Sequence, residues 1–158
     1  MSYTSNVIGK EGIKLISTKG RYALRLMIDV AIYESKGYVS LKDSSQREDL
    51  SIKYLEQVAS LLTRSNLLIS YRGNNGGYKL SRKPSEYKIG EILRAAEGSL
   101  APVACLECSK DFCNRRDICT TIEFWEGFNN VINNYVDNIT LEELVEKAKA
   151  KLTNDYSI

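Results

Sequence analysis

The fold of this 158-residue chain is decided by residues 50–80, which read LSIKYLEQVASLLTRSNLLISYRGNNGGYKL. The first half of this stretch predicts a helix, because apolar residues recur at helical spacing and form one face. These residues are Leu55, Val58, Ala59 and Leu62. Ser51 is a suitable N-cap, since its hydroxyl can accept a hydrogen bond from the free amides of the first turn.

A second face of the same helix carries Lys53, Tyr54 and Gln57 near its N-terminus. A helix with a polar outer face and a firm apolar back is suited to the major groove of DNA. The alternative is an ordinary α+β element whose polar face is simply solvated. The residues after the helix favour the first interpretation.

Residues 67–80 predict a β-hairpin. Residues 67–72 are rich in strand formers, Asn75-Gly76 is a strong two-residue turn signal, and residues 78–80 form the return strand. Arg72 lies just before the glycine-rich tip, where it could enter a narrow minor groove. A helix followed by a hairpin with a basic tip is the order of a winged helix-turn-helix.

Charge is unevenly distributed along the chain. The net charge is +2, but residues 14–83 hold 13 Lys/Arg and 6 Asp/Glu, whereas residues 84–158 hold 8 and 13. The N-terminal half is therefore at +7 and the C-terminal half at −5. A basic half fits a phosphate-backbone partner, and the acidic half argues against nucleic acid running over the whole surface.

Residues 1–13 are polar and are expected to be a disordered extension without the apolar core of a secretory signal. No apolar run approaches the ~20 residues of a membrane span, so we expect a cytoplasmic protein without a membrane partner. A helix is predicted from Ser17 or Thr18 to near Gly37. Arg21 and Arg25 lie one turn apart on its outer side, where they could be solvated or could contact DNA phosphates.

Tyr38-Val39 could form a short strand that pairs with the wing, and Ser40 with Asp43 has capping-box spacing for a second helix. That helix is unusually polar, so its packing is not evident from the sequence. We take residues 14–83 as a winged helix-turn-helix domain and residues 84–98 as a connecting segment, with a helix over 87–97.

The C-terminal part begins with an aperiodic loop over residues 99–120. A long helix is expected from Thr121, and Thr140 with Glu143 forms a capping box for a last helix, so that residues 121–152 hold two helices. The long helix carries two apolar stripes, which is more than one small neighbour can cover. A homodimer is the simplest explanation; packing within the monomer is the alternative. The stripes are Ile122, Trp125, Ile132, Val136 and Ile139, and Phe124, Phe128, Val131 and Tyr135.

The loop holds all four cysteines, Cys105, Cys108, Cys113 and Cys119, with the spacing C-x2-C-x4-C-x5-C. In a reducing compartment such a cluster indicates a metal or redox site before a disulfide framework. Thiolates favour zinc or iron–sulfur clusters. Only one pair has the tight C-x2-C spacing of a zinc knuckle, and the wider spacings are more typical of cluster ligation. An iron–sulfur cluster, a zinc ion and a thiol switch remain open, in that order of preference.

Taken together, the chain resembles the winged-helix regulator family that contains the iron–sulfur cluster regulator IscR and the nitric-oxide and iron sensors NsrR and RirA. The resemblance covers roughly residues 15–145 and includes the three cysteines at 105, 113 and 119. It rests on STKGRYA at 17–23, YLEQ at 54–57, RG at 72–73, GGY at 76–78 and NITLEELV at 138–145.

The resemblance implies a homodimer that places a winged helix from each subunit on an operator in double-stranded DNA. It implies DNA-reading roles for Ser51, Tyr54, Gln57 and Arg72, and a role for Glu56 in tuning site choice. Lys53 replaces a small polar residue of the family, so the operator sequence is not transferable.

The resemblance also implies a cluster, [2Fe–2S] more than [4Fe–4S], on Cys105, Cys113 and Cys119. Ile122 stands where IscR has a histidine ligand, and Arg21 stands where NsrR has an aspartate from the partner subunit. We therefore expect Cys108 as the fourth ligand, with Glu107 behind it, and zinc as the alternative to a cluster.

The sequence thus predicts a mainly α protein with a small β wing (α+β). The expected function is a transcriptional regulator, most simply a repressor, controlled by an iron–sulfur cluster and governing cluster biogenesis or an iron, redox or nitric-oxide response. A cluster-free, thiol- or partner-controlled regulator of sulfur metabolism is the first alternative, and a zinc or redox protein without a DNA role is the second. No enzyme is expected, because the chain lacks histidine, the commonest general base.

Overall fold

The structure, a computed structural model, describes residues 16–107 and 115–155 and confirms a mainly α fold with a small β wing. The extension expected to be disordered, residues 1–13, lies outside the described residues. The elements in chain order are α1 (Thr18–Tyr33), η1 (Glu34–Lys36), α2 (Leu41–Glu48), α3 (Ile52–Arg64), β1 (Leu68–Tyr71), β2 (Gly77–Leu80), η2 (Pro84–Glu86), α4 (Ile89–Glu97), η3 (Ala104–Leu106), η4 (Arg116–Ile118), α5 (Ile122–Asn138) and α6 (Leu141–Asp155).

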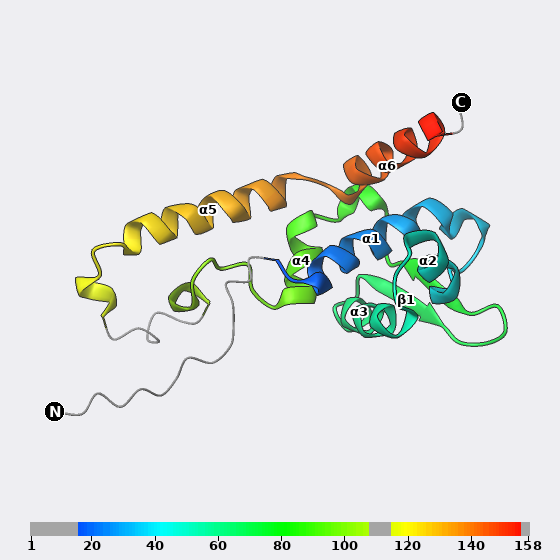
Figure 1. The fold of residues 1–158 in the computed structure, drawn as a ribbon, viewed down its shortest axis with the longest axis horizontal. Helices are drawn as coiled ribbons and strands as arrows, with labels where there is room; N and C mark the ends of the chain where they lie inside the picture. The colour runs from blue at the N-terminus through cyan, green and yellow to red at the C-terminus, as the bar shows by residue number, and fades with distance from the viewer. Residues whose placement is uncertain (1–15, 108–114, 156–158) are drawn as a thin grey trace.

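Helix α1 runs through the middle of the molecule (Figure 1). It begins at Thr18, and its N-cap is Ser17, one of the two predicted candidates, whose hydroxyl accepts a hydrogen bond from the Lys19 amide. Its apolar stripe, Ala23, Leu26, Met27 and Val30, is buried at no more than 1% exposure, and the helix packs against α3, α4 and α6. The core of the described residues therefore forms around one central helix.

The hairpin forms an antiparallel pair with Leu68 opposite Leu80 and Tyr71 opposite Gly77. Its turn differs from the prediction, because the chain reverses one residue earlier than the Asn75-Gly76 signal indicates. Gly73 adopts a φ of +133°, and its carbonyl accepts a hydrogen bond from the Gly76 amide at 2.9 Å. This hydrogen bond makes Asn74 and Asn75 the central residues of the turn. Gly73, which precedes them, takes a conformation with positive φ that favours glycine.

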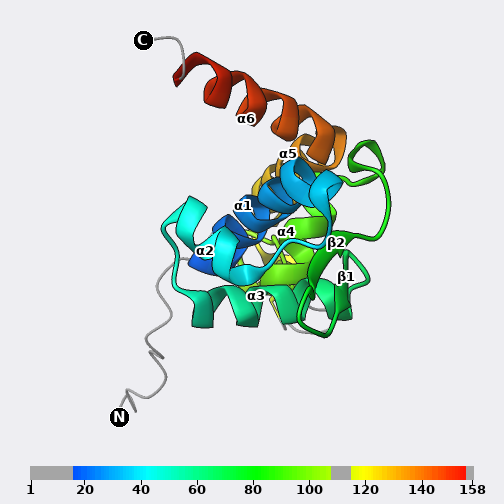
Figure 2. The ribbon, with the colours of Figure 1, turned by 90° about the vertical axis from the view of Figure 1, so that its right-hand side faces the viewer.

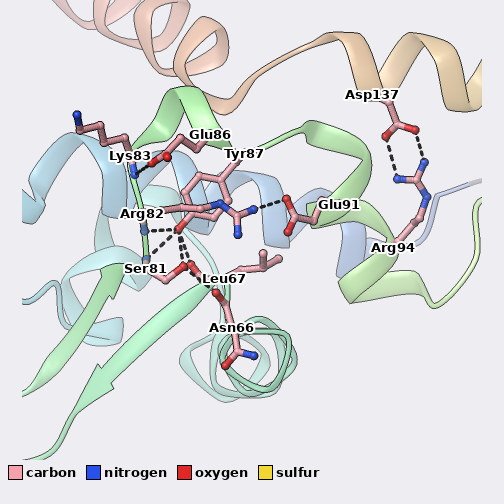
Figure 3. A network of polar contacts seen from close by, with 10 residues as sticks. All are labelled: Asn66, Leu67, Ser81, Arg82, Lys83, Glu86, Tyr87, Glu91, Arg94 and Asp137. Atoms are coloured by element: carbon pink, nitrogen blue, oxygen red, sulfur yellow. Dashed lines mark hydrogen bonds and ion pairs between the residues drawn. The ribbon is translucent and has the colours of Figure 1, made fainter.

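The wing is joined to the body on both sides of its base. Val39 and Tyr78 exchange backbone hydrogen bonds at 2.9 and 2.8 Å, which confirms the short pairing predicted for Tyr38-Val39. The buried Tyr87 hydroxyl accepts from the amides of Ser81 and Arg82 and donates to the Leu67 carbonyl (Figure 3). One side chain thus connects the outer ends of both strands.

Helix α4 begins at Ile89 and not at Tyr87, where the sequence predicted its start. Tyr87 is extended at φ −95° and ψ 131°, and its carbonyl accepts a hydrogen bond from the Leu141 amide. The Ile89 amide donates in turn to the Ile139 carbonyl. This short pairing with the segment before α6 occupies the backbone groups that would otherwise form the first helical turn.

Helix α5 extends away from the body, whereas α6 returns over α1 (Figure 1). The capping box before α6 is present as predicted, because Thr140 and Glu143 exchange hydrogen bonds of 3.0 to 3.3 Å. Arg94 of α4 connects to α5 through Asp137 at 2.6 and 2.9 Å (Figure 3), and it also donates to Asn133 at 2.8 Å. Helix α3 and the hairpin lie on the side of the molecule opposite α6 (Figure 2).

Candidate nucleic-acid interface

Helix α3 presents its polar side to solvent, as its sequence pattern predicts. Leu55, Val58, Ala59 and Leu62 are buried, each at most 1% exposed. The structure brings the candidate residues Ser51, Lys53, Glu56 and Gln57 together as exposed side chains at the N-terminal half of the helix. The N-terminal residues of a recognition helix are those that contact base edges.

Tyr54 differs from the other candidate residues of α3 because it is half-buried. Its ring meets the Tyr22 ring of α1 edge-on, with centroids 5.2 Å apart and an interplanar angle of 83°. Such a pair fixes the ring direction and adds stability beyond the buried area. Tyr54 is therefore held by α1 rather than free to rotate.

Ser51 stands at the N-cap position of α3, as predicted, but its hydroxyl makes no capping hydrogen bond, so that part of the prediction is wrong. The backbone of Ser51 has ψ 124°, whereas Ser17 and Ser40, whose hydroxyls do accept from helix amides, have ψ 178° and 145°. The amides of Tyr54 and Leu55 bond to the Ser51 carbonyl instead. The hydroxyl of Ser51 stays exposed at the end of the helix that carries the positive pole of its dipole.

The wing places Arg72 in an exposed position immediately before the tip. Gly77 lies so close to the segment between α1 and α2 that pairs with β2 that a Cβ on residue 77 would be 2.5 Å from the Val39 carbonyl oxygen. The backbone of β2 can therefore approach Val39 only with glycine at this position. Helix α3 and strand β1 pack together and lie on the same side of the molecule (Figure 2), and Arg72 is the residue that directly follows β1.

The two candidate arginines of α1 have different partners. Arg25 donates from Nε to a carboxylate oxygen of Glu48 and from Nη2 to the Glu48 carbonyl, both at 2.6 Å, so its guanidinium is bound to the end of α2. Arg21 donates to the Thr18 hydroxyl at 3.3 Å and is otherwise exposed on the first turn.

The residues that hold α2 in place were missed by the sequence analysis. Asp29 of α1 is 2% exposed and accepts from Arg47 Nε at 2.7 Å, from Arg47 Nη2 at 2.8 Å and from the buried Ser44 hydroxyl. This hydrogen bond with Asp29 raises the pKa of Arg47. The Arg47 guanidinium also lies 4.1 Å from the centre of the Tyr33 ring. A lone aspartate within the apolar stripe of α1 was the available signal.

The structure describes two of the four cysteines. Cys105 in η3 and Cys119 after η4 are half-buried free thiols, while Cys108 and Cys113 lie outside the described residues. The Cys119 sulfur is 3.6 Å from the Thr121 hydroxyl, and hydrogen bonding by Thr121 lowers the pKa of the Cys119 thiol. Thiolates are the form that binds metals, so the donor chemistry fits a thiolate-bound group. Within residues 16–107 and 115–155, no group of three potential ligands comes together.

Helix α5 exposes one of its two apolar stripes. Ile132 and Val136 pack on the core, but Phe124, Val131 and Tyr135 are 66%, 64% and 69% exposed. The wide apolar circumference predicted for this helix is therefore only partly covered by its own chain. Exposed apolar patches of this kind mark sites of protein association.

Comparison with known proteins bears on both halves of the chain. Residues 16–147 match the family model Rrf2, described as an iron-dependent transcriptional regulator. The HTH-type transcriptional regulator IscR of Serratia proteamaculans is 36% identical over 140 residues, which is 89% of this chain and 84% of that protein.

No helix of the described residues is both long and apolar enough to cross a membrane.

Two solved structures are similar in fold and sequence. CymR, the global cysteine regulator of B. subtilis, has a TM-score of 0.67 and 36% identity, covering 84% of this chain and 96% of that one. IscR of T. potens has a TM-score of 0.64 and 36% identity, covering 89% and 91%. Similarity therefore extends to an IscR and to a cysteine regulator.

Proposed function

Because the chain belongs to the Rrf2 family of transcriptional regulators, we propose that it binds operator DNA as a homodimer and that an iron–sulfur cluster on the cysteine loop controls this binding. In the proposed complex α3 enters the major groove and Arg72 enters the adjacent minor groove. The observation that carries the proposal is the exposed polar face of α3 beside a wing with a basic tip. As transcriptional regulators, the relatives are DNA-binding proteins rather than enzymes.

The uncovered stripe of α5 supports the homodimer. A two-fold axis brings the same apolar stripe of two subunits together, so that each covers the other. Two copies of a single winged helix then face DNA with a fixed spacing, as dimeric readers of half-sites require.

Cys105, Cys108, Cys113 and Cys119 are the residues that would hold the cluster. The free state of Cys105 and Cys119 and the lowered pKa of Cys119 support thiolate ligation. When bound, an iron–sulfur cluster supplies a redox-active group whose potential depends on its protein surroundings. We propose control of cluster biogenesis or of an iron, redox or nitric-oxide response as the biological role.

The second candidate is a cluster-free regulator of cysteine or sulfur metabolism, controlled by thiols or by a partner protein. The similarity to the cysteine regulator of B. subtilis favours it. The same free thiols would then act by exchange with an external disulfide, which is reduced to two thiols as the Cys–Cys bond forms and is re-formed when the bond is reduced. This alternative shares the DNA-binding face and differs only in the signal.

DNA binding is tested with an operator fragment selected from genomic DNA and with fluorescence anisotropy at several salt concentrations. We expect Gln57→Ala and Arg72→Ala each to weaken binding by about 1–3 kcal/mol. Lys149→Ala is the matched control, because Lys149 is exposed on α6, on the opposite side from α3 (Figure 2). Equal affinity of all three variants with the wild type would contradict the proposed interface.

The signal is tested on protein purified without oxygen, by visible absorption and by iron and sulfide assays on the same sample. Iron and sulfide in the wild type, and their loss in Cys119→Ala, are expected for the cluster. Protein that stays colourless after reconstitution and forms a reversible Cys–Cys bond would favour the alternative, with DNA binding unaffected.

A further inference from the structure

The first turn of α1 holds a carboxylate that comes from the end of α4. The Ser17 amide, the Ser17 hydroxyl and the Gly20 amide all donate to Oε1 of Glu97, each at 2.8 Å. The amides at the start of a helix lack partners within the helix, and a negative charge there also interacts favourably with the helix dipole. Glu97 therefore supplies α1 with a capping group from 77 to 80 residues away in sequence.

Gly20 is required for this contact. Its φ is not in the left-handed region, so glycine is needed for space: a Cβ on residue 20 would lie 2.9 Å from Cγ2 of Ile16 and 2.5 Å from Oε1 of Glu97. Since that oxygen ends a flexible side chain, an added methyl group would displace the carboxylate rather than disrupt the helix. Substitution at Gly20 thus breaks the same contact from the opposite side.

The first turn of α1, which Glu97 caps, lies close in sequence to a residue that contacts α3, the helix proposed to read DNA (called the reader helix below). Tyr22 follows Gly20 by two residues, and its ring meets Tyr54 of α3 edge-on at 5.2 Å. Both rings are partly buried against the core. A shift in the first turn of α1 is therefore transmitted to Tyr54 by direct ring contact.

Glu97 is also the last residue of α4 before the cysteine loop. Gly98 follows at a φ of +83° and directs the chain into residues 99–107, which include Cys105. Arg94, one turn earlier, binds Asp137 of α5. The end of α4 is thus the point where the cysteine loop, α5 and α1 meet.

We propose that Glu97 is a positioning residue that ties the base of the cysteine loop to α1 and, through Tyr22, sets the position of Tyr54 on the reader helix. The inference rests on the proposed DNA-binding function and assigns a role to the STKGRYA segment at residues 17–23. In this role Ser17 and Gly20 donate hydrogen bonds to the carboxylate, and the ring of Tyr22 fixes the position of the Tyr54 ring by direct contact.

The test compares Glu97→Ala and Gly20→Ala, which remove the contact, with Glu97→Gln, whose amide oxygen still accepts hydrogen bonds. Glu91→Ala is the control, because Glu91 lies on the same helix but pairs with Arg82 and not with α1. The first readout is the NMR signal of the Tyr54 ring in full-length protein without iron, with thermal unfolding to confirm that each variant is folded. We expect the signal to move in Glu97→Ala and Gly20→Ala and to stay in Glu97→Gln and Glu91→Ala.

The second readout is a double-mutant cycle in operator binding. We expect Glu97→Ala to weaken binding about tenfold in the wild-type background and to add nothing to Tyr54→Ala, since interacting residues are not additive. A general loss of stability would instead multiply the two losses. An unmoved Tyr54 signal, or losses that multiply, would overturn the proposal.

Failure of the proposed DNA-binding function would give a different result from failure of the proposal about Glu97. If the wild-type protein bound no duplex, the DNA-binding proposal would fail, and the Tyr54 signal alone would decide whether Glu97 positions the reader helix.

Discussion

Helices α2 and α5 have opposite compositions and opposite surroundings. Helix α2 reads LKDSSQRE and is almost entirely polar, yet it is anchored through the buried Ser44 and through Arg47. Helix α5 is rich in aromatic and aliphatic residues, yet Val136 is the one buried residue along it. Apolar composition thus shows that a helix needs a cover, but not that its own chain supplies one.

The two helices are held by different interactions. In α2 one buried carboxylate, Asp29, attracts an arginine and a hydroxyl, and a buried charge is tolerated only when it is paired in this way. In α5 the exposed apolar stripe is covered, in our proposal, by a second copy of the chain. Two substitutions test this difference: one places a charge in the stripe of α5, and the other removes the buried charge beneath α2.

The largest effect is expected from Val131→Glu in α5. Val131 is 64% exposed in the single chain, so the fold of the monomer is expected to be unaffected, whereas each dimer would bury two unpaired carboxylates. We expect the dimer dissociation constant to rise at least about 100-fold, measured by analytical ultracentrifugation. Asn130→Glu is the control, because it adds the same charge to an exposed position beside the stripe. Identical association of both variants would show that the stripe is not the interface.

A smaller effect is expected from Asp29→Ala under α2. The change leaves the buried Ser44 hydroxyl and the Arg47 guanidinium without their acceptor, and we expect a loss of about 3 kcal/mol in the free energy of unfolding. Urea unfolding measures it. Arg25→Ala breaks the exposed pair with Glu48 and should cost about 0–1 kcal/mol. Similar losses in the two variants would mean that burial of Asp29 does not determine how α2 is held.

The smallest effect is expected for the Arg94–Asp137 ion pair, whose contribution to stability depends on pH. Hydrogen bonding to Arg94 lowers the pKa of Asp137, so its contribution to stability is present at neutral pH and disappears as the pH falls through that lowered value. We expect Asp137→Asn to lower the free energy of unfolding by less than about 1 kcal/mol at neutral pH, because the pair is partly exposed. In acid, below the ordinary range of aspartate, variant and wild type should converge. A difference that grows in acid would have the wrong sign.

Local chemistry was readable from the sequence. The caps at Ser17, Ser40 and Thr140, and the apolar face of α3, depend on neighbours within four residues, and all formed as predicted. The turn was misplaced because Gly73 offered a left-handed position that the Asn75-Gly76 signal did not reveal.

Contacts between side chains that are far apart in the chain could not be predicted from the sequence. Nothing in residue spacing links Asp29 to Arg47, Arg25 to Glu48 or Glu97 to Gly20. For the candidate site, exposure of Lys53, Gln57 and Arg72 followed from periodicity and turn chemistry. The ring contact that holds Tyr54 depends on how two helices cross, which periodicity alone does not fix.

The Tyr87 hydroxyl at the base of the hairpin has a mechanical consequence. The strands beyond it are four residues long, so the tip stands roughly 13 Å from the base at the usual rise of a strand. A rotation of about 10° at the base would therefore carry Arg72 sideways by about 2 Å, which is about a third of the width of a minor groove. By bonding both strand ends, Tyr87 limits such a rotation at the base, and the Val39–Tyr78 pairing holds β2 at a second point, so that the direction of the tip is fixed by these two contacts together.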